Sequence, residues 1–325
     1  MTQAIRTGVA GPLAVAAALW LAAAGTGSAQ TVGVGTTKGG ATAAVAAVVS
    51  KVVSTKSSVQ MRTQPMAGTQ QYIPIVNAGE MAFGVSNVVQ ATMAVHGTGL
   101  SKDRKYDRLQ MVATLMTFRF GPVVPISSGI KTLADLRGKN YPSGFKASPL
   151  FALVMEAFLV NGGLSLNDVK RVPVVAVSQH WDFFKQGKTD VATGVVGSGI
   201  VQELNASVSG GIRFVSMENS PAALARDAKL LPGVEILGVE PNPRFVGVER
   251  PIHVLAYDYM LWTHQGMDAE IVYQVAKALF ENEKTLHEAS PIWRSHRSAR
   301  MGRDHRLAYH PGAVKLYQEK GAWKR

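Results

Sequence analysis

One pattern occurs three times in succession near the start of the chain, and it restricts the fold more than any other feature. In each unit an extended apolar segment leads into a short polar loop, and a helix-length segment follows. The units begin at Thr31, Val59 and Glu80. Pro74 is expected to shorten or kink the second helix. Such units in series predict a parallel α/β sheet, whose ligands bind beyond the carboxyl ends of the strands.

The three loops contain polar residues and glycines, but they carry no nucleotide-binding motif. Lys38 stands where a G-x-G-x-x-G motif would need a glycine, and Ala41 follows Gly40 where a P-loop would need lysine. A loop above a helix N-terminus can still bind a small anion, because its N–H groups are unpaired and the helix dipole is positive there. The candidate ligand contacts in this half of the chain are therefore Thr36, Thr37, Gly68, Thr69, Ser86 and Asn87.

A fourth loop of this kind precedes a very apolar segment. The open stretch 142–147 leads to Ser148, a candidate N-cap, and to Pro149 at the first helical position. A buried helix is expected from Leu150 to Val160. The arrangement predicts a second anion-binding loop, and an ordinary connection between a strand and a helix is the alternative interpretation.

Two extended segments divide the chain: Phe118–Ile126, which follows the strand-like run Leu109–Leu115, and Pro251–Trp262. The prolines in the first restrict it to a sheet edge or to a crossing. We interpret both segments as crossings between two lobes. The predicted boundaries are residues 30–122 for the first part of lobe I, 123–252 for lobe II, and 253–325 for the return into lobe I.

The second lobe is expected to repeat the α/β scheme. Strands are expected at residues 172–177, 190–196, 212–216 and 234–239, with short helices at 178–186 and after Gly199. Beyond the second crossing, Asp268 is expected to cap a helix that runs to about Leu286 with one apolar face.

Residues 1–29 have the composition of a secretory signal peptide. Arg6 supplies a positive start, residues 13–24 form a short apolar run, and Gly27-Ser28-Ala29 is a small-residue cleavage site. An uncleaved membrane anchor is the alternative, although the apolar run is shorter than the roughly 20 residues that span a bilayer. The sequence therefore predicts an exported, periplasmic protein that is cleaved near Ala29. It contains no cysteine, which excludes disulfides, thiolate catalysis and cysteine-ligated metals.

The chain is basic, with a formal net charge of +12, and loss of Arg6 with the signal would leave +11. Such a charge is compatible with anionic ligands, membrane surfaces or nucleic acid, of which export makes nucleic acid the weakest. From residue 291 onward the chain carries nine Lys or Arg against two acids. A solvated basic surface is the first interpretation of this tail, and docking of a partner, a lipid or a nucleic acid is the alternative. Its arginines recur at every third position: Arg294, Arg297, Arg300, Arg303 and Arg306.

No set of residues in the sequence indicates an enzyme. His287-Glu288 lacks the second histidine of HExxH, and His305 and His310, five residues apart, lack a nearby carboxylate triad to complete a metal site. No serine lies in a G-x-S-x-G elbow. The sequence therefore predicts a protein without a catalytic role, a metal or another cofactor, and a two-lobed binding protein is the simplest function.

Segments along the whole mature chain resemble the TAXI-type solute receptors of TRAP transporters. The resemblance is carried by VGVGTTKGG, NAGEMAFGVSN, LQMVATLM, SGIKTLADLRGKNYPSG, FKQGKTDVATGVVGSG and YQVAKALFENEKTL, and most specifically by YHPGAVKLYQEKGAW at the end. It implies a type II periplasmic-binding fold with two lobes, each a mostly parallel sheet flanked by helices, and a ligand cleft between them. It also implies delivery of a small solute to a TRAP-type membrane permease. The chain departs from the family at Thr42, Ala43 and Ala44, where members usually have two tyrosines, so its pocket is expected to differ.

The predicted ligand is a small organic anion, a carboxylate or dicarboxylate, held between the lobes. In the second lobe the expected contacts are Ser143, Gly144, Phe145, Lys146, Gly194 and Ser198. Lys146 is the expected cation of that lobe, and Lys38 is the corresponding candidate in the first. A sensory protein that docks on a membrane signalling partner is the alternative function, and an exported enzyme on the same fold is a third.

Overall fold

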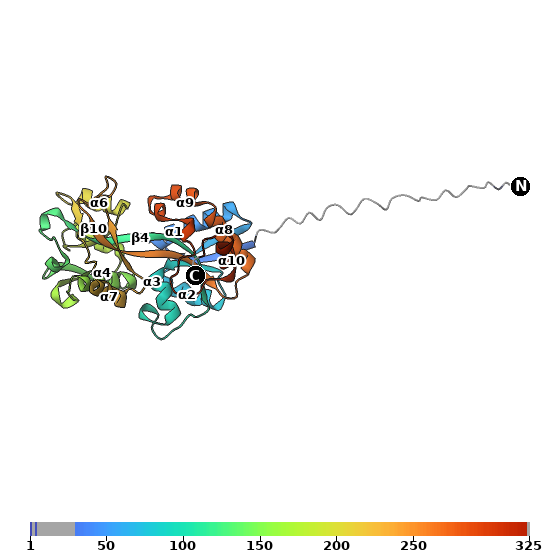
Figure 1. Cartoon of the computed structure of the whole chain (residues 1–325), viewed down its shortest axis with the longest axis horizontal. Helices are drawn as coiled ribbons and strands as arrows, with labels where there is room; N and C mark the ends of the chain where they lie inside the picture. Colours follow the sequence, from blue (N-terminus) through green and yellow to red (C-terminus); the bar gives the residue numbers. More distant parts are fainter. Residues whose placement is uncertain (2–3, 5–29, 324–325) are drawn as a thin grey trace.

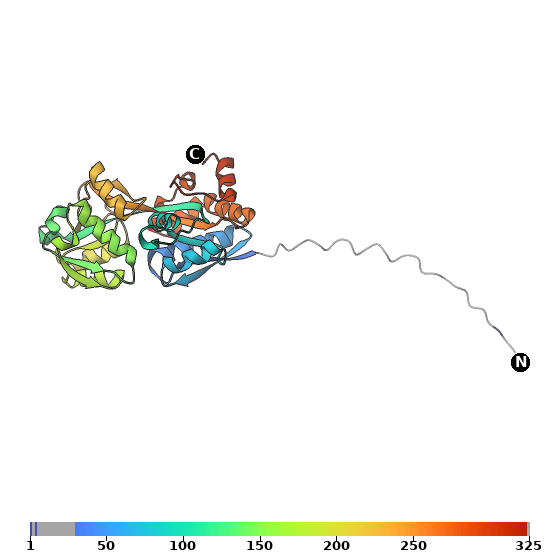
Figure 2. The same cartoon turned by 90° about the horizontal axis from the view of Figure 1, so that it is seen from below.

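The computed structural model describes residues 1, 4 and 30–323 and has two halves joined by extended strands (Figure 1). The predicted signal peptide lies almost wholly outside the described residues. One half contains the N-terminal helices and the C-terminal helices, and the other contains the middle of the chain (Figures 1 and 2). No helix in the described ranges is long and apolar enough to cross a membrane.

The three predicted strand–loop–helix units are present at the start of the first half. Strand β1 pairs in parallel with both β2 and β3, which gives the order β2-β1-β3. The predicted parallel arrangement of these three strands is therefore confirmed, but the sheet as a whole is mixed, because β10 (Ile252–His264) pairs with β3 in antiparallel register. Pro74 lies within the second, ten-residue helix and does not end it. The elements are β1 (Gln30–Thr37), α1 (Gly40–Lys56), β2 (Val59–Met66), α2 (Thr69–Ala78), β3 (Phe83–Asn87) and α3 (Val88–His96).

Two long strands, β4 (Leu109–Pro125) and β10 (Ile252–His264), run from one half into the other (Figure 1). They pair with each other in antiparallel register, from Leu255 opposite Phe120 to His264 opposite Leu109. Strand β10 also pairs with β3 in the first half and with β9 (Glu235–Val239) in the second. These two strands are the extended segments that the sequence analysis interpreted as crossings.

The second half contains more antiparallel pairing than the sequence analysis expected. Strands β7 (Ala192–Val195) and β8 (Ile212–Phe214) pair antiparallel with β4, and β5 (Asn140–Gly144) forms a separate parallel pair with β6 (Lys170–Val174). Residues 142–144 therefore belong to a strand and are not part of the predicted loop. The helices are α4 (Pro149–Asn161), α5 (Val177–Lys185), α6 (Gly199–Ser207) and α7 (Pro221–Leu230).

The C-terminal segment returns to the first half, where α8 (Ala269–Phe280), α9 (Glu283–Ala289) and α10 (Pro311–Glu319) pack. Asp268 caps α8 as predicted, through its Oδ1, which accepts from the N–H groups of Glu270 and Ile271. The prediction of a single helix to about Leu286 is wrong beyond Phe280, because residues 281–282 interrupt the helix and separate α8 from α9. Short 3-10 turns occur at Gly99–Ser101, Ile126–Ser128, Leu133–Leu136, Leu166–Asp168, Pro291–Ser295 and Ser298–Arg300.

The tail arginines do not form one helical surface. Four of them, Arg294, Arg297, Arg300 and Arg306, are exposed, as the solvated-surface interpretation expects. Arg303 differs, because its guanidinium forms ion pairs with Asp258 and Glu235. The spacing of three residues therefore does not distinguish Arg303, which is part of the packed structure, from the four exposed arginines.

Candidate functional site

A cavity of about 710 Å³ lies where the two halves meet β4 and β10. Such a volume is within the range of about 300–1,000 Å³ that is typical of small-molecule sites. Side chains from both halves line it, and the crossing strands contribute four aromatic residues. Its lining is Thr37 to Thr42, Ala44, Ala67 to Gln70, Asn87, Gln90, Phe118, Phe120, Ala147 to Phe151, Val154, Ala176 to Ser178, Trp181, Thr193, Val195, Ser198, Ile200, Tyr257, Tyr259 and Ile292.

Six helices begin at this cavity, three from each half of the protein. In every one of α1 to α6 the N-cap residue is part of the lining: Gly39, Gly68, Asn87, Ser148, Ala176 and Ser198. The first three follow β1, β2 and β3, because parallel strands in one sheet bring their carboxyl ends to the same edge. The convergence of helix starts is therefore a consequence of the repeated strand–loop–helix order.

Five of these six helix starts have no side-chain cap. Only Asn87 caps its own helix, by accepting a hydrogen bond from the N–H of Gln90 at 3.0 Å. The first turns of α1 to α6 also contain no acidic residue. The positive ends of the helix dipoles therefore remain available to an anion in the cavity, together with first-turn N–H groups other than those of Gln71 and Phe151, which donate to the carbonyls of Gly68 and Ser148.

Lys38 is the single charged side chain in the lining of this cavity, as far as the described residues show. It is exposed and lies in the loop between β1 and α1, next to the start of α1. Its backbone N–H donates to the carbonyl of Met66 at 2.9 Å, which ties the loop after β1 to the end of β2. One cation and no carboxylate give the cavity a positive charge.

A buried polar cluster supports the starts of α2 and α3. The side-chain Nδ2 of Asn87 donates to Oε1 of Gln90 at 2.9 Å, and the hydroxyl of Thr69 donates to the same oxygen at 3.4 Å. Tyr72 holds Thr69 in turn, with its hydroxyl 3.2 Å from Oγ1. These two bonds orient the amide of Gln90 through its Oε1. Its Nε2 makes no hydrogen bond to a described residue, so it can donate to a ligand in the cavity.

Four aromatic rings on the crossing strands form what we call the aromatic floor: Phe118 and Phe120 on β4, and Tyr257 and Tyr259 on β10. The ring centroids of Phe120 and Tyr257 are 4.7 Å apart, and those of Phe118 and Tyr259 are 4.9 Å apart. Residues two apart on a strand share a face, so each strand contributes its pair to the same side of the sheet.

The two tyrosine hydroxyls of the floor have different surroundings. Tyr259 has its hydroxyl 3.2 Å from that of Thr42 on α1, whereas the hydroxyl of Tyr257 has no hydrogen-bond partner among the described residues. Burial raises the pKa of both phenols. Both are therefore neutral at physiological pH and can donate a hydrogen bond to a ligand.

A layer of buried residues supports the second-half wall of the cavity. Nδ1 of His180 bonds to the carbonyl of Val177, and its Nε2 lies 3.2 Å from the N–H of Thr193, which lines the cavity. Burial lowers the pKa of His180 to about 4, so the ring is neutral and accepts from Thr193. Phe145 packs against this histidine, with the centroids of the two rings 5.5 Å apart.

The predicted site residues fall into two groups. Five of them line the cavity: Thr37, Gly68, Thr69, Asn87 and Ser198. Seven do not: Thr36, Ser86, Ser143, Gly144, Phe145, Lys146 and Gly194. Whether the first group binds a ligand stays a prediction.

Several residues of the second group have structural partners. Ser86 is buried and accepts from Nε1 of Trp262 at 2.9 Å, and Phe145 is buried in a left-handed conformation with φ of 47°. Gly194 packs so closely that an added Cβ would lie 2.7 Å from a methyl of Val201. Lys146 is exposed and lies outside the lining, so Lys38 is the better-placed cation.

The aromatic floor was not predicted, although the sequence carries a signal for it. Phe118-Arg119-Phe120 and Tyr257-Asp258-Tyr259 both repeat an aromatic residue at a spacing of two, which puts each pair on one face of a strand. Gln90 was also missed. Its position, three residues after Asn87, is that of the partner in a capping pair.

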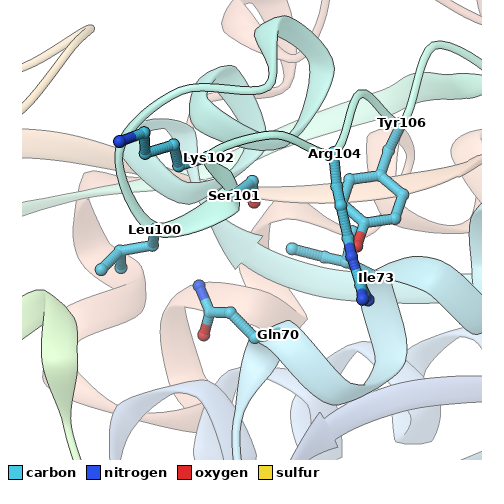
Figure 3. A pocket seen from close by; sticks show the side chains of 7 residues that line it. All are labelled: Gln70, Ile73, Leu100, Ser101, Lys102, Arg104 and Tyr106. Carbon is cyan, nitrogen blue, oxygen red and sulfur yellow. The ribbon is translucent and has the colours of Figure 1, made fainter.

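A smaller pocket of about 250 Å³ lies beside α2 and shares Gln70 with the larger one. Lys102 and Arg104 are both at this pocket, but their side chains extend in different directions (Figure 3). The two cations therefore do not converge on one ligand position. Among the described residues, no group of three or more His, Asp or Glu is placed to hold a metal ion.

Two solved structures with the same architecture, MatC and a periplasmic transporter, confirm the predicted two-lobed periplasmic-binding fold. MatC from Rhodopseudomonas palustris, solved with bound malate, matches with a TM-score of 0.53 and 16% identity over 90% of this chain and 96% of MatC. A structure described as a periplasmic transporter matches with the same TM-score and identity over 90% of this chain and 94% of its own. The alkanesulfonate-binding protein SsuA from Xanthomonas axonopodis pv. citri, bound to MOPS, has a TM-score of 0.46 and 15% identity over 90% of this chain and 79% of SsuA.

No curated protein matches the sequence. A family model does match, from residue 31 to residue 321, which is almost all of the described chain. The chain therefore belongs to the NMT1-like family.

Proposed function

We propose that this protein is an exported solute receptor that binds a small organic anion in the cavity between its halves. The observation that carries the proposal is the convergence of six helix N-termini on one cavity, five of them without a side-chain cap. Lys38 adds a full positive charge, and Nε2 of Gln90 adds a hydrogen-bond donor. None of the described residues that line the cavity is acidic, so none opposes an anion.

The energetics require direct contacts in addition to the helix dipoles. Micromolar affinity corresponds to about 8 kcal/mol, and one helix end supplies roughly 0.3–1 kcal/mol, about 2 at best. Charge-assisted hydrogen bonds from first-turn N–H groups, Lys38 and Gln90 would supply much of the remainder in a closed, dry cavity. A ligand that reaches both halves gains from both sets of helix ends, so closure and binding favour each other.

In this proposal residues 30–122 and 253–325 form lobe I, residues 123–252 form lobe II, and the lobes close on the solute. The receptor would work in the periplasm and deliver its solute to a TRAP-type permease. The motifs shared with TAXI-type receptors along the mature chain support this assignment. So does the fold shared with MatC, which holds malate in its own structure.

The cation supplies the sharpest test. In calorimetric titrations with small carboxylates and sulfonates, Lys38→Met should weaken binding about 10- to 100-fold, as expected when a hydrogen bond to a charged group is lost. Lys51→Met is the matched control, because Lys51 is exposed on α1, the helix that follows Lys38, but does not line the cavity.

Lys146→Met separates the two candidate cations. This variant should bind as tightly as the wild type, because Lys146 does not line the cavity. Equal affinity of Lys38→Met and the wild type would contradict the proposed role of Lys38. Conversion of a bound probe into a product would contradict the receptor assignment itself.

A further inference from the structure

Our further inference rests on the proposed function and concerns the class of solute. We infer that the cavity binds an anion with a sizeable apolar body, and that short dicarboxylates are poor ligands. The anionic group would lie at the helix starts near Lys38, and the body would lie on the aromatic floor. The inference depends on the chemistry of the lining away from those helix starts.

The floor offers a ligand almost only apolar surface. Phe118, Phe120, Tyr257 and Tyr259 present their rings to the cavity, and four of the ring pairs have centroids between 4.7 and 6.3 Å apart. Each of these four side chains is at most 7% exposed, so the packing around them fixes the rings in place. Fixed rings in a row suit a flat or extended apolar group, whose burial against them is favourable because it removes apolar surface from water.

The wall from the second half and the segment after α9 continue this apolar surface. The wall contributes Leu150 and Phe151 of α4 and Trp181 of α5, and Ile292 approaches from the C-terminal segment. The indole Nε1 of Trp181 donates to the carbonyl of Thr193 at 2.9 Å, so its polar atom is already satisfied. Apolar side chains thus surround the body of a ligand on several sides.

A polar solute would leave its groups unpaired on this surface. Each buried polar group without a partner would weaken binding about 5- to 150-fold, and the floor offers the hydroxyls of Tyr257 and Tyr259 as its partners. Tyr259 already bonds to Thr42, whereas Tyr257 makes no hydrogen bond to a described residue although it is only 7% exposed. The floor therefore has one free hydroxyl, enough for a single hydrogen-bonding group on an otherwise apolar body.

The size of the cavity agrees with such a ligand. Its volume of about 710 Å³ is that of sites for drug-sized molecules, and it is larger than a four- or five-carbon diacid needs. A short diacid bound near Lys38 would place its second carboxylate on the aromatic floor or at the helix starts of the second half. The described lining has no second cation at either place, so the helix dipoles of the second half would compensate that charge only in part. The poorly compensated charge would reduce the affinity of the diacid.

The test uses calorimetry on the full mature chain to compare monocarboxylates that differ only in their apolar part with a neutral alcohol and a dicarboxylate. The probes are butyrate, hexanoate, 3-phenylpropionate, its neutral analogue 3-phenylpropan-1-ol, and glutarate. Affinity should rise about fourfold for each added methylene from butyrate to hexanoate, the factor expected for one buried CH₂. The acid 3-phenylpropionate should bind at least tenfold more tightly than both the alcohol and glutarate.

A variant localises the apolar contact. Phe151→Ala removes a half-buried ring from the wall and should weaken 3-phenylpropionate about tenfold, with little change for butyrate. Val175→Ala is the matched control, because Val175 is 55% exposed and lies outside the lining. Circular dichroism and thermal unfolding of both variants would show that the folded state is kept.

The outcomes separate the inference from the function on which it rests. Glutarate binding as tightly as 3-phenylpropionate would overturn the inference and leave the anion receptor standing. The alcohol binding as tightly as the acid would overturn the anion receptor. Failure of all probes to bind at millimolar concentration would overturn the inference, because the apolar contribution alone should then have been detectable for the aromatic probes.

Discussion

Arg303 and Asp258 form an ion pair directly behind the aromatic floor, with Nη1 of Arg303 2.8 Å from Oδ2 of Asp258. Asp258 lies between Tyr257 and Tyr259 on β10 and is 2% exposed. Successive residues of a strand face opposite sides, so the two tyrosines face the cavity and the carboxylate faces the C-terminal segment. The other carboxylate oxygen accepts from the hydroxyl of Thr117 on β4 at 2.6 Å. The ion pair therefore ties both crossing strands to the chain that follows α9.

Removal of the arginine should destabilise the protein strongly. Arg303→Met leaves the buried carboxylate of Asp258 without its main partner, and loss of one member of a buried ion pair costs about 3–5 kcal/mol. We expect about 3 kcal/mol in urea unfolding, because the Arg303 side chain is 26% exposed. Arg300→Met is the control at an exposed position and should change stability by less than about 0.5 kcal/mol. Equal stability of the two variants would contradict the structural role of Arg303.

His180 should make the protein less stable in acid. Its pKa is about 4 in the folded state against 6.5 for the free side chain, so between these values the unfolded chain binds the extra proton. The stabilisation is therefore complete above about pH 6.5 and is lost as the pH falls toward 4, by about 3 kcal/mol in total. His180→Gln should show a shallower decrease of unfolding free energy over this range. The other buried histidines contribute equally to the wild type and to His180→Gln. Unfolding free energies that fall in parallel with pH for the two proteins would therefore contradict the prediction.

Asp227 should have the opposite pH dependence. Burial raises its pKa from 3.8 to about 6, and its Oδ1 has no hydrogen-bond partner among the described residues, whereas Oδ2 accepts from Nδ2 of Asn161 at 2.8 Å. The folded state binds the proton more tightly, so the contribution of Asp227 falls as the pH rises from about 4 to 6. Asp227→Asn should raise the unfolding free energy by about 2 kcal/mol at pH 8 and leave it nearly unchanged at pH 4. A variant that is less stable than the wild type at pH 8 would refute this account.

Much of the fold could be predicted because its signals are local. The alternation of strand, loop and helix at the start of the chain, and the cap Asp268 before an apolar helical face, depend on residues within a few positions of one another. Two local signals were overlooked. Ser220 followed by Pro221 marks the start of α7, and Asn282, whose Nδ2 bonds to the carbonyl of Ala278, marks the break after α8.

The site was harder to predict, because its residues meet only through long-range pairing. Phe120 on β4 pairs with Leu255 on β10, and its ring contacts that of Tyr257, two residues further along β10. No local sequence pattern indicates that β4 and β10 are neighbours. The loops were predicted as ligand contacts because they precede helices, but the direction of each side chain depends on packing. Ser86 points to Trp262, and Phe145 packs against His180, so neither lines the cavity.

Closure of the lobes should be visible in solution. Strands β4 and β10 are the continuous elements that join the halves, so rotation about them would narrow the cavity. Small-angle X-ray scattering should show a smaller radius of gyration when a tight-binding solute saturates the protein. The Lys38→Met variant at the same solute concentration should remain closer to the unliganded value. An unchanged radius at saturation would count against a receptor that closes.

The central claim is that the cavity holds one small anion, and native mass spectrometry tests it most directly. Protein that has been unfolded, stripped of ligand and refolded would be incubated with a metabolite extract of its own host. The account predicts a single adduct of one molecule per chain, with at least one negative charge at neutral pH. This adduct should be kept by Lys51→Met and at least tenfold reduced in Lys38→Met. A neutral adduct, an adduct that Lys38→Met retains in full, or no adduct from any extract would contradict it.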